Sequence, residues 1–257
     1  MSNTATNLRK LAVPFCAIYW LALVASPVQA AEVNVAVAAN FTTPMKRIVE
    51  KFEKDTGHKV VMSFSSTGRF YAQITHGAPF DVFLSADDDT PARLEKEGAA
   101  VAGSRFTYAT GRLVLWSAKP GLVDEKAAML LRSDFKYLAI AAPKLAPYGA
   151  AAVETLTKLG MLPQLQTKLV TGESIGQTFS MISSGNADLG FVAMSQVFED
   201  GKLKNGSVWV VPGHLHSPLK QDAVILVRGR NNPAALQLMT FMRSGQARAI
   251  MNSYGYE

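Results

Sequence analysis

Four turns of this 257-residue chain place neutral hydrogen-bond donors where a predicted strand gives way to a predicted helix. The donor side chains in these turns are Asn40, Ser65, Ser66, Thr67, Tyr148 and Ser174. A helix N-terminus offers unpaired backbone N–H groups and the positive end of the helix dipole, and both suit an anion. Ordinary helix caps use the same residue types, so the pattern fits either simple caps or an anion site.

The elements that must position these turns follow from hydrophobic periodicity. Apolar runs at 33–39, 58–64, 137–142 and 168–171 predict the strands before the turns, and apolar residues at helical spacing follow each one. Further strands are predicted at 81–85, 112–116, 188–193, 208–211 and 223–227, and helices at 233–243 and 247–254. Strands that alternate with helices indicate a parallel, doubly wound α/β architecture, in which ligands bind at the carboxyl ends of the strands.

The charge of the chain is spread too evenly for a nucleic-acid binder. Lys and Arg total 26 against 20 Asp and Glu, and no run contains more than two cations. A nucleic-acid interface gathers such an excess on one face, so we expect a mildly basic surface and no nucleic-acid partner. The single cysteine excludes an intramolecular disulfide framework and any zinc module built on cysteines.

The first thirty residues have the pattern of a targeting segment. Arg9 and Lys10 precede an apolar stretch at 11–25, and Val28-Gln29-Ala30 is a cleavage signal of the small-x-small type. The stretch has 15 residues, which is short of the ~20 that span a bilayer. We predict a cleavable signal peptide over 1–30, a mature chain that begins at Ala31, and a periplasmic location. An uncleaved membrane anchor is the alternative.

Two patterns leave an enzyme or a metal site open. The sequence Gly-Glu-Ser-Ile-Gly at 172–176 matches the nucleophile turn of serine hydrolases, with Ser174 at its centre and His214 and His216 downstream. The same histidines, or the acidic run at 87–89, are the right residue types for metal ligands, although a polar loop and a solvated helix start are the favoured interpretations. We expect no enzymatic activity, and we keep a periplasmic hydrolase that uses Ser174 as the alternative.

Several longer stretches resemble the periplasmic molybdate-binding proteins of ABC transporters. These stretches are 37–41, 64–74, 77–87, 103–109, 146–149 and 187–193, so the resemblance covers essentially the whole chain after residue 30. The run from Gly77 to Asp87, with the Ser-Ser-Thr-Gly turn at 65–68 before it, is the most specific part.

The resemblance implies a two-lobed α/β fold, with a sheet flanked by helices in each lobe and two crossover strands between the lobes. The first lobe would comprise residues 31–111, completed by 223–257, and the second would comprise 112–222. A monomeric receptor without a cofactor would bind an oxyanion between the lobes and deliver it to a membrane permease. The implied ligand is molybdate, with tungstate, and another oxyanion such as sulfate is the alternative.

The resemblance also implies which residues contact the ligand. They are Ala39, Asn40, Ser66, Thr67, Tyr148 and Ile175, with backbone N–H donation expected at Tyr148 and Ile175. Molybdenum would be held by Asn40, Thr67, Tyr148 and Ile175 only as its oxyanion. None of these residues is acidic, which argues against hydrogenphosphate, because its proton needs an acceptor. Glu173 adjoins the fourth turn and is expected to point to solvent.

Overall fold

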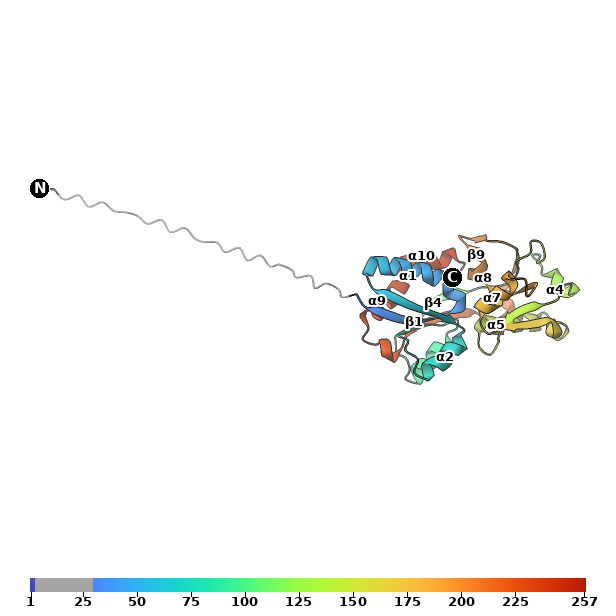
Figure 1. The fold of residues 1–257 in the computed structure, drawn as a ribbon, viewed down its shortest axis with the longest axis horizontal. Helices are drawn as coiled ribbons and strands as arrows, with labels where there is room; N and C mark the ends of the chain where they lie inside the picture. The colour runs from blue at the N-terminus through green and yellow to red at the C-terminus, as the bar shows by residue number, and fades with distance from the viewer. Residues whose placement is uncertain (3–29) are drawn as a thin grey trace.

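The structure is a computed structural model that describes residues 1–2 and 30–257 (Figure 1). Nearly all of the predicted signal peptide lies outside the described residues. Within those ranges, no helix has the length and apolar character needed to cross a membrane.

The first lobe is built on a mixed five-stranded sheet with the order β2-β1-β3-β12-β4. Its strands are β1 (Glu32–Ala38), β2 (Lys59–Ser65), β3 (Val82–Leu84), β4 (Phe106–Gly111) and β12 (Leu219–Ile225). Strand β1 is parallel to β2 and β3, whereas β12 is antiparallel to β3 and β4. The helices of this lobe are α1 (Thr42–Thr56), α2 (Thr67–Thr75), α3 (Asp89–Lys96), α9 (Pro233–Met242) and α10 (Gly245–Ser253).

The second lobe repeats the plan on a sheet with the order β11-β5-β8-β6-β7. Its strands are β5 (Leu113–Ser117), β6 (Leu138–Ala141), β7 (Leu169–Gly172), β8 (Leu189–Ala193) and β11 (Ser207–Val210). Strand β6 is parallel to β7 and β8, and β5 is antiparallel to β8 and β11. The helices are α4 (Ala128–Arg132), α5 (Pro147–Lys158), α6 (Leu162–Leu165), α7 (Ile175–Ser183) and α8 (Met194–Val197), and β9 (Phe198–Glu199) pairs with β10 (Lys202–Leu203).

The two sheets are mixed and not wholly parallel, and the two crossings between lobes explain why. A strand that is followed by a helix ends at the cleft between the lobes. A strand that arrives from the other lobe begins there, so it must run the opposite way. Strand β5 follows β4 directly through Arg112, and β12 arrives from the second lobe at Leu219, four residues before the predicted start of that strand. Both are antiparallel to neighbours in their sheet.

Alternating side chains along β1 divide the core of the first lobe into two layers. Val33, Val35 and Val37 are buried on the side of α1, α9 and α10, whereas Ala36 lies with Phe70 of α2. Because both faces are covered, β1 is rigid and delivers the first turn to a fixed place.

The C-terminus closes the first lobe beside the crossover. The backbone N–H of Thr110 donates to the oxygen of Glu257 at 2.7 Å, and the N–H of Glu257 donates to the oxygen of Thr110 at 3.1 Å. Tyr256, next to this pair, is buried. The last residues of the chain are therefore attached to the strand that leads from one lobe to the other.

Candidate anion-binding site

The four donor-bearing turns meet at a small cavity between the two lobes. Its lining includes all six residues implied as ligand contacts, namely Ala39, Asn40, Ser66, Thr67, Tyr148 and Ile175. The other lining residues are small or apolar, and none carries a charge. The cavity volume of about 10 Å³ is close to the ~10–15 Å³ that one water molecule needs. The cavity is thus small in this closed arrangement of the lobes.

Helix starts surround this cavity on both lobes. Helix α2 begins after Ser66, α5 begins at Pro147, and α7 begins at Ile175 after Ser174, whose Oγ accepts a hydrogen bond from Gln177 N at 3.2 Å. Proline suits the first helical position because its fixed φ is helical and that position needs no donor. The first N–H groups of each helix have no partner inside it, so Tyr148 and Ile175 are placed to donate from the backbone.

The first turn is a short 3₁₀ helix, η1 (Ala39–Phe41), between β1 and α1. Asn40 in this turn is only 2% exposed. Its Nδ2 donates to Gln221 Oε1 at 2.8 Å and to Tyr256 OH at 2.9 Å, and its backbone oxygen accepts from Ser195 Oγ at 2.8 Å. Within residues 30–257, Asn40 Oδ1 is buried without a partner.

In the second turn the neighbouring hydroxyl groups of Ser66 and Thr67 differ in their hydrogen bonds. Thr67 Oγ1 accepts from the backbone N–H of Ala86 at 3.0 Å and lies 3.3 Å from Ser85 Oγ, so it ties the turn to the end of β3. Ser66 Oγ is buried and has no hydrogen-bond partner in the described part of the chain. Ser66 is therefore the hydroxyl that is free for a ligand, whereas Thr67 already has a structural role.

The hydroxyl group of Tyr148 lies at the crossover between the lobes. It accepts from Gln221 Nε2 at 3.0 Å, and a Cβ at Gly111 would come within 2.0 Å of it. Burial raises the pKa of Tyr148 and Tyr108 well above the ordinary value and raises the pKa of Tyr256 to about 12, so all three phenols keep their protons at neutral pH. The Tyr148 hydroxyl group thus already has a partner inside the protein, and its backbone N–H lies in the first turn of α5.

Hydrogen bonds and ion pairs between the lobes hold them closed. Gly68 N donates to Leu145 O at 2.9 Å, and Arg47 pairs with Glu199 at 3.0 Å. Arg69 of α2 pairs with Glu173, which is exposed as predicted and does not line the cavity. These contacts surround the cavity, so the closed arrangement and the site form together.

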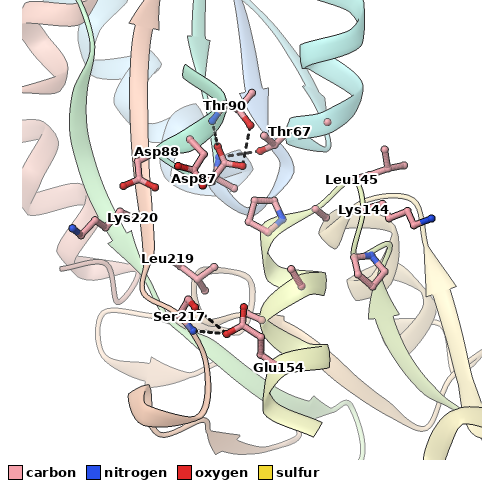
Figure 2. Close-up of a pocket in the computed structure, with 18 of the residues that line it drawn as sticks. Thr67, Asp87, Asp88, Thr90, Lys144, Leu145, Glu154, Ser217, Leu219 and Lys220 are labelled. Atoms are coloured by element: carbon pink, nitrogen blue, oxygen red, sulfur yellow. Dashed lines mark hydrogen bonds between the residues drawn. The ribbon is translucent and has the colours of Figure 1, made fainter. Parts of the chain in front are cut away.

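A wider cleft of about 290 Å³ adjoins the cavity and is lined by acidic side chains together with Lys144 and Lys220 (Figure 2). Figure 2 shows Asp87 beside Thr67, with hydrogen bonds from Thr90, and Glu154 across the cleft with Ser217. Burial raises the pKa of Asp87, while the hydrogen bonds from Thr90 and Ser85 act in the opposite direction. These carboxylates already have donors, and none lines the smaller cavity.

The sequence also left open a metal site and a hydrolase that uses Ser174, and the geometry of these residues bears on both. In the described ranges, no group of three or more His, Cys, Asp or Glu residues could hold a metal ion. His216 Nδ1 pairs with Ser217 O at 2.7 Å. Ser174 Oγ caps α7 by accepting from Gln177 N, and between residues 30 and 257 no hydrogen bond joins Ser174 to a histidine.

Sequence reasoning missed three residues that support the first turn. Gln221, Tyr108 and Tyr256 surround the Asn40 side chain from β12, β4 and the C-terminus. The partners of Asn40 lie 181 and 216 residues away in the chain. Gln221 stands between Lys220 and Asp222 in β12, so the local sequence gives no signal of such a network.

A family model and individual relatives both indicate that this chain is similar to bacterial solute-binding proteins. Residues 33–257 match the family described as bacterial extracellular solute-binding protein. The molybdate-binding protein ModA of Azotobacter vinelandii is 60% identical over 234 residues, which cover 91% of this chain and 93% of that protein. The protein of the same name from Rhodobacter capsulatus is 50% identical over 256 residues, which cover 100% of this chain and 99% of that protein.

Solved structures agree with the fold. The periplasmic molybdate-binding protein of Azotobacter vinelandii superposes with a TM-score of 0.85 at 44% identity, covering 88% of this chain and 98% of that one. The sulfate-binding protein SubI of Mycobacterium tuberculosis superposes with a TM-score of 0.66 at 14% identity, covering 88% of this chain and 86% of that one. At this identity the likeness shows a shared fold alone. The fold is thus the two-lobed α/β fold of periplasmic binding proteins, and the relatives are binding proteins, not enzymes. This chain belongs to the bacterial extracellular solute-binding protein family.

Proposed function

We propose that this protein is a periplasmic receptor that binds molybdate, and tungstate with it, and delivers the anion as a monomer to the permease of an ABC transporter. The observation that carries the proposal is the uncharged cavity at which four strand–helix turns converge. Two relatives named molybdate-binding proteins, at 60% and 50% identity, support the same ligand. The anion is the transported ligand and not a cofactor.

The chemistry of the lining favours an anion that needs donors only. Molybdate, tungstate and sulfate are fully deprotonated at neutral pH. We assign side-chain donation to Asn40 and Ser66, and backbone donation to Ala39, Tyr148 and Ile175. Thr67 lines the site with its hydroxyl group tied to Ala86 N–H. Neutral donors suffice because a charged acceptor strengthens each hydrogen bond.

The proposed donors lie on both sides of the cleft, so binding couples to closure. We take residues 31–111 with the C-terminal segment as one moving unit, and we begin that segment at Leu219 instead of residue 223, because β12 pairs with β4 from Leu219 onward. Residues 112–218 are the other unit. Titration calorimetry with molybdate, tungstate and sulfate tests the assignment. Tight molybdate and tungstate binding is expected. Sulfate binding as tight as molybdate binding would favour a sulfate receptor, and no binding of any of them would refute the proposal.

Asn40→Ala is expected to lower molybdate affinity by about 10- to 100-fold, because one charge-assisted hydrogen bond is worth roughly 1.5–3 kcal/mol. Ser66→Ala is expected to fall in the same range for the same reason. Ser174→Ala is the control, since it keeps the backbone N–H of Ile175 and costs only about 1 kcal/mol of stability through the lost cap. Calorimetry of the three variants, beside their melting temperatures, measures both effects. Parent-like binding by Asn40→Ala and Ser66→Ala would place the site elsewhere.

We also propose that the exported protein begins at Ala31. The backbone N of Ala31 lies 3.1 Å from His58 Nδ1, a contact that an N-terminus created at this residue would retain. Mass spectrometry of the secreted protein is expected to give the mass of residues 31–257. A secreted form that still contains Cys16 would contradict cleavage at this site.

A further inference from the structure

A buried network of two amides and three phenols lies behind the cavity. Gln221 is fully buried, and its Oε1 accepts from Asn40 Nδ2 at 2.8 Å and from Tyr108 OH at 2.9 Å. Its Nε2 donates to Tyr148 OH at 3.0 Å. Asn40 Nδ2 gives its second proton to Tyr256 OH at 2.9 Å. The polarity of the whole network is thus defined by which way two amides point.

In this arrangement Asn40 has no side-chain proton left for a ligand. Both Nδ2 protons have acceptors, and Oδ1 is the amide atom without a partner in residues 30–257. Asn40 lines the cavity, where an amide oxygen would repel an oxyanion. The arrangement is therefore incompatible with donation from the Asn40 side chain to an anion.

Rotating both amides by half a turn gives a second network with the same atoms. Gln221 Nε2 then donates to Asn40 Oδ1 and to Tyr108 OH, and Tyr148 OH donates to Gln221 Oε1. Tyr108 OH can accept because its own proton has Ser85 O, at 2.8 Å, as an acceptor. Tyr256 OH donates to Asn40 Oδ1. Asn40 Nδ2 then takes the position of the unpartnered Oδ1, so its two protons have no acceptor in residues 30–257 and are available to an anion at the cavity.

We propose that Gln221 is a positioning residue that turns the Asn40 amide toward the oxyanion, and that ligand binding rotates the two amides together. The inference rests on the proposed function, since it needs an anion at the cavity. Asn40 cannot reverse alone, because its Oδ1 would then face Gln221 Oε1, and two acceptors would meet. The phenols permit the reversal because a protonated hydroxyl group both donates and accepts.

The same network reaches the crossover. Tyr148 OH accepts from Gln221 in one polarity and donates to it in the other, and it lies against Gly111, where the chain passes between lobes. Gln221 belongs to β12 of the first lobe, and Tyr148 belongs to α5 of the second. The proposed reversal therefore changes a hydrogen bond between the lobes at the moment the anion binds.

A double-mutant cycle on the full mature chain tests the inference with molybdate as the probe. Gln221→Met keeps the length of the side chain and removes both hydrogen-bonding atoms. It is expected to lower molybdate affinity about tenfold in the parent and less than about twofold in the Asn40→Ala background, because Gln221 acts through Asn40. Gln237→Met, the same change at an exposed position of α9, is the matched control and is expected to bind like the parent.

Equal losses in the two backgrounds would overturn the inference, because a merely structural glutamine weakens binding whether or not Asn40 is present. A second measurement needs no substitution of Gln221. In ¹⁵N-labelled parent protein, molybdate is expected to shift the side-chain NH₂ signals of both Asn40 and Gln221, and an unmoved Gln221 signal would refute the paired rotation. A parent that binds none of the tetrahedral oxyanions would refute the proposed function itself. A parent that binds while the cycle is additive would refute this inference alone.

Discussion

Hydrogenphosphate is expected to bind at least about 100-fold more weakly than molybdate, a difference of about 2.7 kcal/mol. Its remaining proton needs an acceptor, and the cavity is lined by no carboxylate. The nearest acidic groups already have partners: Asp87 accepts from Ser85 and Thr90, and Glu173 pairs with Arg69. Among the lining side chains Asn40 carries the one amide oxygen, and turning that oxygen to the anion gives up an N–H donation. A buried polar group left without a proper partner costs about 1–3 kcal/mol, which matches the expected difference.

Parallel calorimetric titrations at one ionic strength measure this selectivity. Sulfate serves as the matched control, since it is a tetrahedral dianion without a proton and differs from molybdate only in size among the properties that matter here. Phosphate that binds as tightly as molybdate would show that an acceptor faces the ligand, and the donor assignment would then be wrong.

Gly149→Ala is expected to abolish tight binding and to destabilise the fold together. Gly149 lies in the first turn of α5, and an added Cβ would be 2.1 Å from the oxygen and 2.7 Å from the carbonyl carbon of Ala141. Both atoms are backbone of β6, so α5 must move away from the sheet and carry the N–H of Tyr148 out of the cavity. We expect at least a 100-fold loss of molybdate affinity. Overpacking of this kind costs about 3 kcal/mol, which lowers Tm by roughly 6–12 °C in a protein of this size.

Gly245→Ala is the matched control. Gly245 also begins a helix, α10, but nothing lies within 4 Å of an added Cβ there. Thermal unfolding and calorimetry of the two variants separate the clash from a general effect of alanine for glycine. Parent-like affinity and Tm in Gly149→Ala would mean that α5 does not pack on β6 as closely as described.

The local part of this architecture could be predicted from the sequence. Periodicity located the strands before the four turns to within about two residues, because apolar alternation and helix-start signals are local properties. Strand direction could not be predicted in the same way. Whether β5 and β12 run parallel or antiparallel depends on the lobe from which the chain arrives, and that is a property of the whole path.

The candidate site, too, could be predicted from the sequence only in part. The resemblance placed Asn40, Tyr148 and Ile175 at one cavity, and the structure brings them together there. The difference between Ser66 and Thr67 could not be predicted, because two adjacent hydroxyl groups differ only in which one meets Ala86 N–H. Gln221 and Tyr256 were beyond prediction for another reason: their contacts with Asn40 join segments about 200 residues apart, and no sequence period records such contacts.

The place of β12 between β3 and β4 has a consequence for synthesis and export. In the first sheet, β4 pairs only with β12, so the early strands of this lobe are two separate pieces until residues 219–225 have left the ribosome. Tyr256 and Glu257 join still later. Because these contacts are among the most distant in sequence, the first lobe cannot complete itself during translation. We therefore expect the first lobe to remain incomplete while the chain is being made, and an incomplete lobe is easier to unfold for passage through a secretion channel.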